Sequence, residues 1–327
     1  MNASFVRRHA RYGRRRRGVA LLAALIMVAI ATTLAAAVFF DTGLLLRRTE
    51  GGSAQDRAQL LAGGAEALAA DLLREELDTG TAPVHAAQRW GNPLGPLEVP
   101  DAGTIQGQLT DLQGRFNLNS LIGADGRVDP VALEVFERLL RTLELEPVWA
   151  LRLADWLDAD DQPLGGGAED DLYSALQPGY RPPNLPITSV GELQWLEGFD
   201  EARLARLAPH VAALPRDAGI NLCTATPALL DALLNERQWT DAEQSLARNR
   251  ERNCFPRRDD FRAALGDPET FERLDKSLGL GERSRYFQLR SLAVVGTATF
   301  SLYSLLRYEN SPPEPPRLRV LRRQLAD

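Results

Sequence analysis

The chain has 327 residues, 44% hydrophobic residues and a net charge of −6, so it has enough apolar material for a core and enough length for more than one domain. The first 17 residues are strongly basic, and the rest of the chain is therefore clearly acidic. An acidic body argues against binding to the phosphates of a nucleic acid, but it leaves room for binding a cation.

A basic block and an apolar run stand together near the N-terminus. Four arginines, residues 14–17, are followed by Gly18 and then by residues 19–40, which carry no charge. As a helix this run would be about 33 Å long, which is enough to cross the hydrocarbon core of a bilayer. Arginines directly before the run favour a cytoplasmic N-terminus, with the remaining chain on the other side of the membrane.

Three interpretations of this segment remain open on the residues alone. Residues 35–37 are three alanines, which offer a cleavage site to a conventional signal peptidase. The run could instead be a permanent anchor. In a prepilin-type signal, a glycine separates the charges from the apolar run, and cleavage after Gly18 would leave Val19 as the first residue of the mature protein.

Residues 41–78 contain no proline and are predicted to continue the same helix. Their apolar residues at helical spacing predict a stripe that packs on a sheet: Leu61, Ala65, Leu68 and Leu72. The glycine pairs at 51–52 and 63–64 weaken a helix by up to about 1 kcal/mol per glycine and could bend it. A loop with several prolines is expected over residues 83–100.

The rest of the chain alternates strand and helix signals. Residues 104–111 alternate in hydrophobicity and predict a strand. Helical spacing begins at residue 130, a second helix is expected over 147–157, and further short helices are expected over 189–276. Two β-rich runs, 286–295 and 298–308, surround Gly296-Thr297 and predict a hairpin, and residues 317–321 predict an edge strand. The predicted fold class is α+β, with one long helix on an antiparallel sheet and a large all-helical domain inserted between strands of that sheet.

The acidic stretch 155–171 carries most of the chain's candidate chemistry. It holds seven carboxylates within 17 residues, around a turn of three glycines at 165–167. Calcium takes six to eight oxygen ligands, and glycines allow a chain to fold around such an ion, but the spacing is not that of an EF-hand. A solvated acidic loop and a calcium site both remain open from the residues alone, with acid–base catalysis as a third reading. None of the three histidines (His9, His85 and His210) has a nucleophilic partner visible in the sequence.

Three further features have structural interpretations. Residues 189–214 resemble a helix-hairpin-helix module, but Asp200 and Glu201 stand where a phosphate would need positive charge, so a packing unit is expected. Thr226 and Pro227 predict the N-cap and first residue of a helix over 228–235. Cys223 and Cys254 are the only cysteines, and in an exported body they are expected to form a disulfide rather than a reactive site.

Six short motifs follow one another along the chain in fixed order: Arg17-Gly18-Val19-Ala20-Leu21-Leu22, Gly114-Arg115-Phe116-Asn117-Leu118-Asn119, Asp155-Trp156-Leu157-Asp158-Ala159-Asp160, Gly167-Ala168-Glu169-Asp170, Tyr180-Arg181-Pro182-Pro183-Asn184 and Ser189-Val190-Gly191-Glu192-Leu193. With these motifs the chain resembles a known family, general secretion pathway protein K, the large minor pseudopilin of type II secretion systems. The resemblance extends from Gly18 to about Leu321.

The resemblance implies a division of the chain and a processing route. It implies a prepilin leader (1–18), a transmembrane and filament-core helix (19–40), a pilin-like part (41–116), an inserted helical domain (117–282) and C-terminal strands of the pilin-like part (283–327). Prepilin peptidase would cut between Gly18 and Val19, and the new N-terminus would be methylated. The resemblance also implies calcium in the inserted domain, with ligands drawn from Asp158, Asp160, Asp161, Glu169, Asp170 and Asp171.

One residue departs from the wider pilin pattern. Most pilins carry a glutamate at the fifth mature position, but here that position, counted from Val19, is Ala23. Members of the protein K family typically lack this glutamate. A buried carboxylate without a partner would be costly, and a subunit at the filament tip has no subunit above it to supply one.

The function expected from the resemblance is that of an assembly protein and not an enzyme. The chain would lie in the bacterial inner membrane with a periplasmic body, meet the inner-membrane assembly platform, form a complex with other minor pseudopilins, and cap and help initiate the pseudopilus. One alternative is a membrane-tethered helix-hairpin-helix protein that binds DNA for uptake. A second is an exported calcium-dependent hydrolase.

Overall fold

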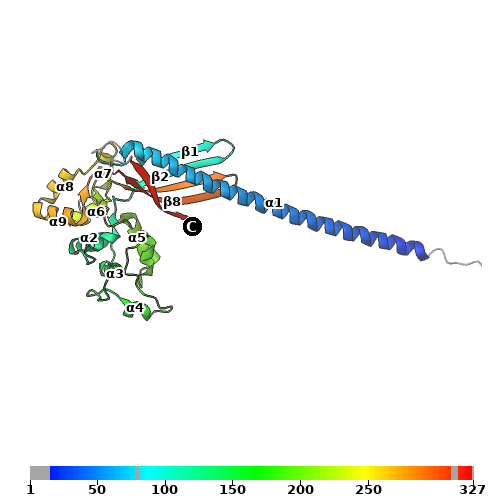
Figure 1. Cartoon of the computed structure of the whole chain (residues 1–327), viewed down its shortest axis with the longest axis horizontal. Helices are drawn as coiled ribbons and strands as arrows, with labels where there is room; N and C mark the ends of the chain where they lie inside the picture. Colours follow the sequence, from blue (N-terminus) through cyan, green and yellow to red (C-terminus); the bar gives the residue numbers. More distant parts are fainter. Residues whose placement is uncertain (1–14, 78–81, 311–315, 326–327) are drawn as a thin grey trace, which may run out of the picture.

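The computed structural model describes residues 15–77, 82–310 and 316–325, and its most extended element is one helix. Helix α1 (Arg15–Leu77) has 63 residues and is therefore about 95 Å long. Figure 1 shows its first half projecting away from the rest of the molecule, while its second half lies along a sheet. The helix continues through both glycine pairs, and an added Cβ at Gly51, Gly52, Gly63 or Gly64 would meet no atom within 4 Å.

The sheet has five antiparallel strands in the order β1-β2-β7-β8-β9. The strands are β1 (Leu94–Val99), β2 (Gly103–Asp111), β7 (Tyr286–Val295), β8 (Ala298–Glu309) and β9 (Arg317–Leu325). Neighbours β2 and β7 are separated in sequence by residues 112–285, which form the inserted part of the chain. A long helix on an antiparallel sheet with an insertion between two paired strands confirms the predicted fold class.

Strand β1 was not predicted, because residues 83–100 were expected to be loop. Among the described strands it pairs only with β2, and it carries a bulge between Leu94 and Leu97, where Pro96 lies. Proline lacks a donor for the ladder and is tolerated in sheets at edges and bulges, and this strand combines both conditions. Pro96 is therefore compatible with an edge strand, although the prolines of this stretch had suggested a loop.

The face of α1 that packs on the sheet is rotated from the predicted stripe. The residues that are 1% exposed or less are mostly alanines: Ala58, Ala62, Ala69, Leu73 and Leu77. Of the predicted stripe only Ala65 is buried, and Leu68 is 46% exposed. Small side chains let the helix lie close to the sheet, so the leucines that the spacing favoured lie at the border of the contact or outside it.

An ion pair between a buried glutamate and a largely exposed arginine joins α1 to the last strand. Glu66 is 6% exposed, and the guanidinium of Arg323 approaches it with two contacts, Nη2 to Oε2 at 2.7 Å and Nε to Oε1 at 2.8 Å. Burial raises the pKa of Glu66, but the hydrogen bonds that Arg323 and Ser304 donate outweigh burial and lower it. The carboxylate is therefore held ionised between the helix and the sheet.

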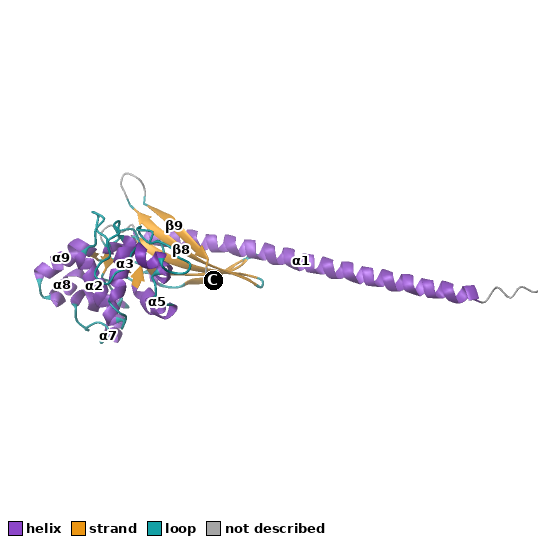
Figure 2. Ribbon diagram, turned by 90° about the horizontal axis from the view of Figure 1, so that it is seen from below, coloured by secondary structure: helices purple, strands orange, loops and turns teal. Residues whose placement is uncertain are grey.

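The insert is helical apart from two short ladders. Strand β3 (Phe116–Asn117) pairs in parallel with β4 (Val211–Ala212), and β5 (Ile220–Asn221) with β6 (Leu280–Gly281). The α-helices are α2 (Pro130–Thr142), α3 (Val148–Leu157), α4 (Asp170–Ser174), α5 (Glu201–Leu207), α6 (Pro227–Leu234), α7 (Glu243–Arg250), α8 (Arg258–Leu265) and α9 (Pro268–Leu278). The 3-10 turns of the insert are η2 (Leu118–Leu121), η3 (Val190–Trp195) and η4 (Ala208–His210), and a further turn, η1 (Arg89–Gly91), precedes β1. Figure 2 shows this helical mass at the end of the sheet that lies away from the free half of α1.

The helix starts that capping residues predict in the insert are present in the structure. Thr226 is the N-cap of α6, with its hydroxyl accepting from the amide of Leu229, and Pro227 opens the helix. Ser189 and Glu192 form a capping box, but the segment that follows is the 3-10 turn η3 and not an α-helix. Cys223 and Cys254 are bonded to each other, with their Cα atoms 4.6 Å apart.

Candidate functional site

The acidic stretch forms a loop between α3 and α4, at the end of the insert far from the sheet (Figure 1). Asp155, in the last turn of α3, is fully buried and organises this loop. Its Oδ1 accepts a hydrogen bond from the amide of Leu164 at 3.1 Å, and its Oδ2 accepts one from the amide of Ala168 at 2.7 Å. Asp155 therefore holds the glycine turn back against the helix, and it was absent from the ligand candidates drawn from the sequence.

Gly167 makes this arrangement possible, because a Cβ at this position would lie 1.8 Å from Oδ2 of Asp155. We expect Gly167→Ala to push Asp155 out of its hydrogen bonds and to destabilise the protein by about 1–3 kcal/mol. Urea unfolding of the full chain measures this. Gly165→Ala is the control, because no atom lies within 4 Å of a Cβ there. Equal stability of the two variants would contradict the role assigned to Asp155.

Two carboxylates in the loop have buried oxygens that receive no hydrogen bond from the described residues. Asp158 and Glu169 are each 5% exposed. Oδ1 of Asp158 and both carboxylate oxygens of Glu169 accept no hydrogen bond. Burial, and then the charges of neighbouring aspartates, raise the pKa of Asp158 to about 6 and that of Glu169 to about 7. Buried carboxylate oxygens without donors are rare because their desolvation is uncompensated, so these oxygens fit a cation that would satisfy them.

The other four candidate ligands lie nearer the surface. Asp160, Asp161 and Asp171 are exposed, while Asp170 is partly buried and lies 3.4 Å from the guanidinium of Arg181. Within the described residues, no three acidic, histidine or cysteine side chains converge as a ready-made metal cage. The loop therefore offers two inward carboxylates with four more at its margin, and a bound ion would also need neutral oxygen ligands.

The segment that resembles a helix-hairpin-helix module is built for packing. Asp200 is the N-cap of α5 and accepts from the amide of Arg203 at 2.9 Å, which places negative charge where a DNA phosphate would bind. Leu193, Leu196, Phe199 and Leu207 are buried in the core of the insert. The structure therefore agrees with the expected packing role.

The two histidines in the described residues have no catalytic arrangement, and His9 lies outside those residues. Burial lowers the pKa of both His85 and His210. His210 Nδ1 lies 3.1 Å from the hydroxyl of Thr226, whose oxygen also accepts from the amide of Leu229 as the N-cap of α6. This pair has the geometry of a structural contact.

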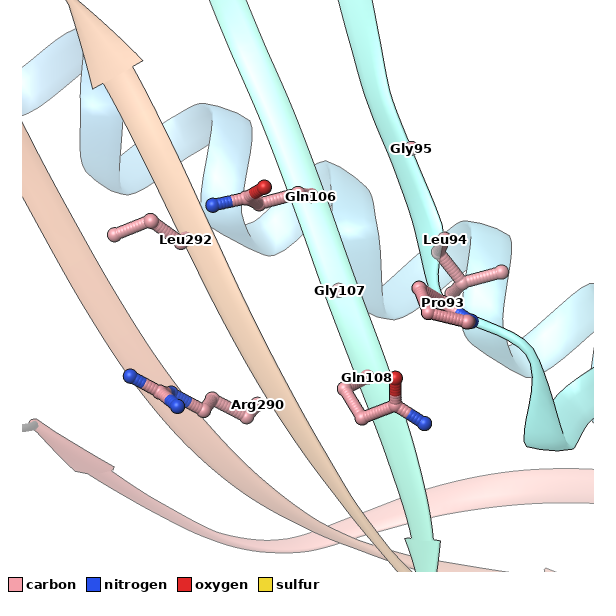
Figure 3. Close-up of a pocket in the computed structure, with 8 residues that line it drawn as sticks. All are labelled: Pro93, Leu94, Gly95, Gln106, Gly107, Gln108, Arg290 and Leu292. Atoms are coloured by element: carbon pink, nitrogen blue, oxygen red, sulfur yellow. The ribbon is translucent and has the colours of Figure 1, made fainter.

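A shallow groove of about 240 Å³ lies between β1, β2 and β7 (Figure 3). Gln106 and Gln108 alternate with the residues of β2 that are buried toward α1, so they lie on the opposite face of the sheet, with Arg290 and Leu292 of β7 beside them. The lining contains no carboxylate, histidine, serine or cysteine. It therefore lacks the groups that acid–base or nucleophilic chemistry requires.

The free half of α1 is an exposed apolar surface. One span within the described residues, Val19–Leu77, is long and apolar enough to cross a membrane, with a mean hydropathy of 2.5 in its most apolar window and none of that window buried. This is compatible with a single-pass anchor. Gly18 lies within the helix, and Ala23 lies in its first apolar turns.

Comparisons with known proteins agree with this architecture. Residues 114–216 match the sequence family described as type II secretion system (T2SS), protein K. The chain is 38% identical to type II secretion system protein K of Pseudomonas aeruginosa, over 75% of this chain and 74% of the relative. It is 32% identical to the protein of the same description from Pectobacterium carotovorum subsp. carotovorum, over 95% and 96% of the two chains.

A solved structure shares the fold. A chain in the crystal structure of the GspK-GspI-GspJ complex from the type 2 secretion system of enterotoxigenic Escherichia coli superposes with a TM-score of 0.72 and 27% identity, covering 86% of this chain and 99% of that one. The length of the matches, together with the shared fold, confirms the relationship that the sequence motifs indicated. This chain belongs to the type II secretion system protein K family.

Proposed function

We propose that this chain, a minor pseudopilin of a type II protein secretion system, caps the periplasmic pseudopilus and helps to start its assembly in a complex with other minor pseudopilins. The observation that carries the proposal is the placement of the insert. It lies at the end of the molecule opposite to the free, apolar half of α1 (Figures 1 and 2). A filament built by packing such helices side by side would leave no room for a further subunit above this bulk, so the subunit is confined to the tip.

The apolar half of α1 would have one role in the membrane and a second role in the assembled filament. Before assembly it would span the inner membrane once, with its arginines in the cytoplasm and its body in the periplasm. After assembly its exposed leucines, valines and phenylalanines would pack against the helices of other pseudopilins and contact the inner-membrane assembly platform on the way. Prepilin peptidase would release the leader after Gly18, and Val19 would become the methylated N-terminus.

Ala23 supports a place at the tip. In the mature numbering it occupies the position at which most pilins carry a glutamate for the N-terminal amine of a neighbouring subunit. A subunit with nothing above it has no such amine to meet, and a carboxylate there would be buried without a partner.

We also propose that the acidic loop binds calcium. Asp158 and Glu169 would supply the inner ligands, because Oδ1 of Asp158 and both carboxylate oxygens of Glu169 are buried without a donor among the described residues. Asp160, Asp161, Asp170 and Asp171 are the pool for the remainder. A divalent cation would neutralise the repulsion within this loop and so hold the end of the insert in one conformation. This is a structural role, in keeping with a protein that assembles rather than catalyses.

The alternatives receive less support. A net charge of −6 that includes the basic leader, together with the acidic N-cap of α5, disfavours a DNA-binding function. We expect the protein in detergent to leave the mobility of double-stranded DNA unchanged at any salt concentration. A hydrolase would need a nucleophile and base in one pocket, and the groove of Figure 3 offers neither.

A complementation experiment tests the proposed function. In a bacterium that carries this system, deletion of the gene should abolish the release of folded exoproteins, and the intact gene should restore it. A variant whose residues 19–40 are replaced by an unrelated transmembrane helix of equal length should remain in the membrane without restoring secretion. Restored secretion in that variant would show that the run is only an anchor.

A further inference from the structure

A small pocket lies at the corner where the insert meets the face of the sheet that is turned away from α1. Its volume is about 160 Å³, and two arginines line it together, Arg115 at the start of the insert and Arg322 on β9. Pockets for drug-sized ligands usually measure about 300–1,000 Å³. This pocket therefore fits a group as small as a carboxylate or a phosphate.

The register of the sheet directs Arg322 toward this corner. Arg322 pairs with Leu305, and Leu305 pairs with Gln288, so the three residues form one row across β9, β8 and β7. Leu306 is buried against α1, and because side chains alternate along a strand, the row lies on the opposite face. Burial lowers the pKa of Arg322, and the charge of Glu192, in the turn η3 of the insert, raises it. The guanidinium thus extends from the sheet toward the insert.

Arg115 reaches the same pocket from the insert. Its Nη1 donates a hydrogen bond at 3.3 Å to the backbone carbonyl of Ala208, which also lines the pocket. Among the described residues this is the one hydrogen bond that the guanidinium makes. A guanidinium carries five N–H donors, so most of those of Arg115 remain for a ligand.

Neither guanidinium forms an ion pair with a carboxylate of residues 15–77, 82–310 or 316–325. Burial lowers the pKa of Arg115, and the charge of Asp111 raises it. The carboxylate of Asp111 already accepts from four donors, and Oε1 of Glu192 already accepts from three. The pKa of both arginines is lowered on balance, so their positive charges are partly desolvated without full compensation.

The other groups that line the pocket suit an anion. The lining residues in the described part of the chain include no aspartate or glutamate. They do include Gln288, Gln324 and Ser189, whose amide and hydroxyl groups can donate hydrogen bonds. The planar fork of an arginine matches the two oxygens of a carboxylate or a phosphate, and such charge-assisted bonds are among the strongest that side chains make.

We propose that this pocket binds an oxyanion, a carboxylate or a phosphate group, between Arg115 and Arg322. The anion would join the edge strand β9 to the start of the insert and so hold the insert against the sheet. Its source is either a free anion or an acidic side chain of another subunit, because both present the same oxygens to the two guanidiniums.

Arg322→Gln tests the site, because it removes one guanidinium from an edge strand and leaves the core of the insert unchanged. The full chain in detergent is titrated with sodium phosphate by calorimetry, with the ionic strength held constant by sodium chloride. We expect saturable binding by the wild type and a phosphate dissociation constant about tenfold or more higher in the variant, because a charge-assisted hydrogen-bonding partner is lost. Arg319→Gln is the matched control, since it removes an exposed arginine of the same strand that does not line the pocket, and its affinity should equal that of the wild type.

Amide hydrogen exchange locates the bound anion. In the wild type, phosphate should slow exchange in β9 and in residues 112–116, which the anion would join. In Arg322→Gln the same phosphate concentration should leave exchange in both segments unchanged. Absence of saturable binding by the wild type, or equal phosphate affinity of the wild type and Arg322→Gln, would overturn the assignment of this pocket.

The source of the anion is distinguished by repeating the phosphate titration on the chain in complex with the other minor pseudopilins. Phosphate binding that persists in the complex assigns the pocket to a free anion. Loss of phosphate binding in the complex assigns it to an acidic side chain of a partner that occupies the pocket. This second titration alone rests on the proposed function, whereas the first tests the pocket in the isolated chain.

Discussion

Asp111→Ala is expected to destabilise the protein by about 2–5 kcal/mol, because it would leave several buried donors unsatisfied. Asp111 ends β2 at the point where the chain leaves the sheet for the insert. Its Oδ2 accepts from Asn221 at 2.9 Å, Thr224 at 2.5 Å and Ser284 at 2.6 Å, and its Oδ1 accepts from the amide of Gln113 at 2.8 Å. Urea unfolding of the full chain in detergent measures the loss.

The variant Asp111→Asn keeps the size of the side chain but cannot ionise, so it distinguishes the effect of the carboxylate charge from the effect of losing the side chain. Burial raises the pKa of Asp111 even though four hydrogen bonds lower it, so the folded state favours the protonated form more than the unfolded state does. The stability contributed by this group is therefore present below its ordinary pKa and falls as pH rises toward the folded pKa. We expect Asp111→Asn to lose less stability than Asp111→Ala and to flatten that decline. A variant with the pH dependence of the wild type would contradict this account of Asp111.

The paired substitution of Asp158→Asn and Glu169→Gln is expected to weaken calcium binding by about 100-fold or more, because it removes the inner charged ligands. In a chelator the same variant should melt at a higher temperature than the wild type, since it relieves two buried carboxylates whose pKa values burial raises. In the presence of calcium the wild type should melt at the higher temperature, because an ion at 100 times its dissociation constant stabilises the wild type by about 2.7 kcal/mol.

Thermal unfolding with and without calcium measures this reversal. The control pair is Glu236→Gln and Asp241→Asn, two exposed positions of the insert outside the acidic stretch, which should leave the order of melting temperatures as in the wild type. A paired Asp158 and Glu169 variant that gains as much stability from calcium as the wild type would show that the ion, if bound, sits elsewhere.

The sequence predicted those elements whose signals are local. Gly296 has a positive φ of 59° in the tight turn between β7 and β8, and this is the geometry that the Gly296-Thr297 signal predicted. Thr226 and Pro227 marked the start of α6 through capping chemistry alone. The apolar run of residues 19–40 was evident as a long helix for the same reason.

The elements that escaped prediction depend on partners distant in sequence. β1 exists because β2 offers it an edge, and its proline lies in a bulge. The face of α1 was misjudged because leucines gave the stronger spacing signal, whereas the sheet selected the smaller alanines. The contact between Glu66 and Arg323 joins residues 257 positions apart, and no pattern in the sequence could pair them.

The acidic loop shows the same contrast between what local sequence predicts and what depends on distant residues. Composition identified the stretch, but not which carboxylates turn inward. Asp155 and Asp158 stand three positions apart and have different surroundings: Asp155 receives backbone amides, while Asp158 keeps an oxygen without a donor. Burial and hydrogen-bond partners distinguish these residues, and neither can be read from spacing.

The N-terminal sequence of the mature protein tests the central claim most directly. The account treats Gly18 as the end of a leader and α1 as a helix that passes from the membrane into a filament. Mass spectrometry of the protein purified from membranes of its own bacterium should find an N-terminus at Val19 that carries a methyl group. A protein that begins at Val38, after a conventional cut that discards the apolar run, would contradict the account.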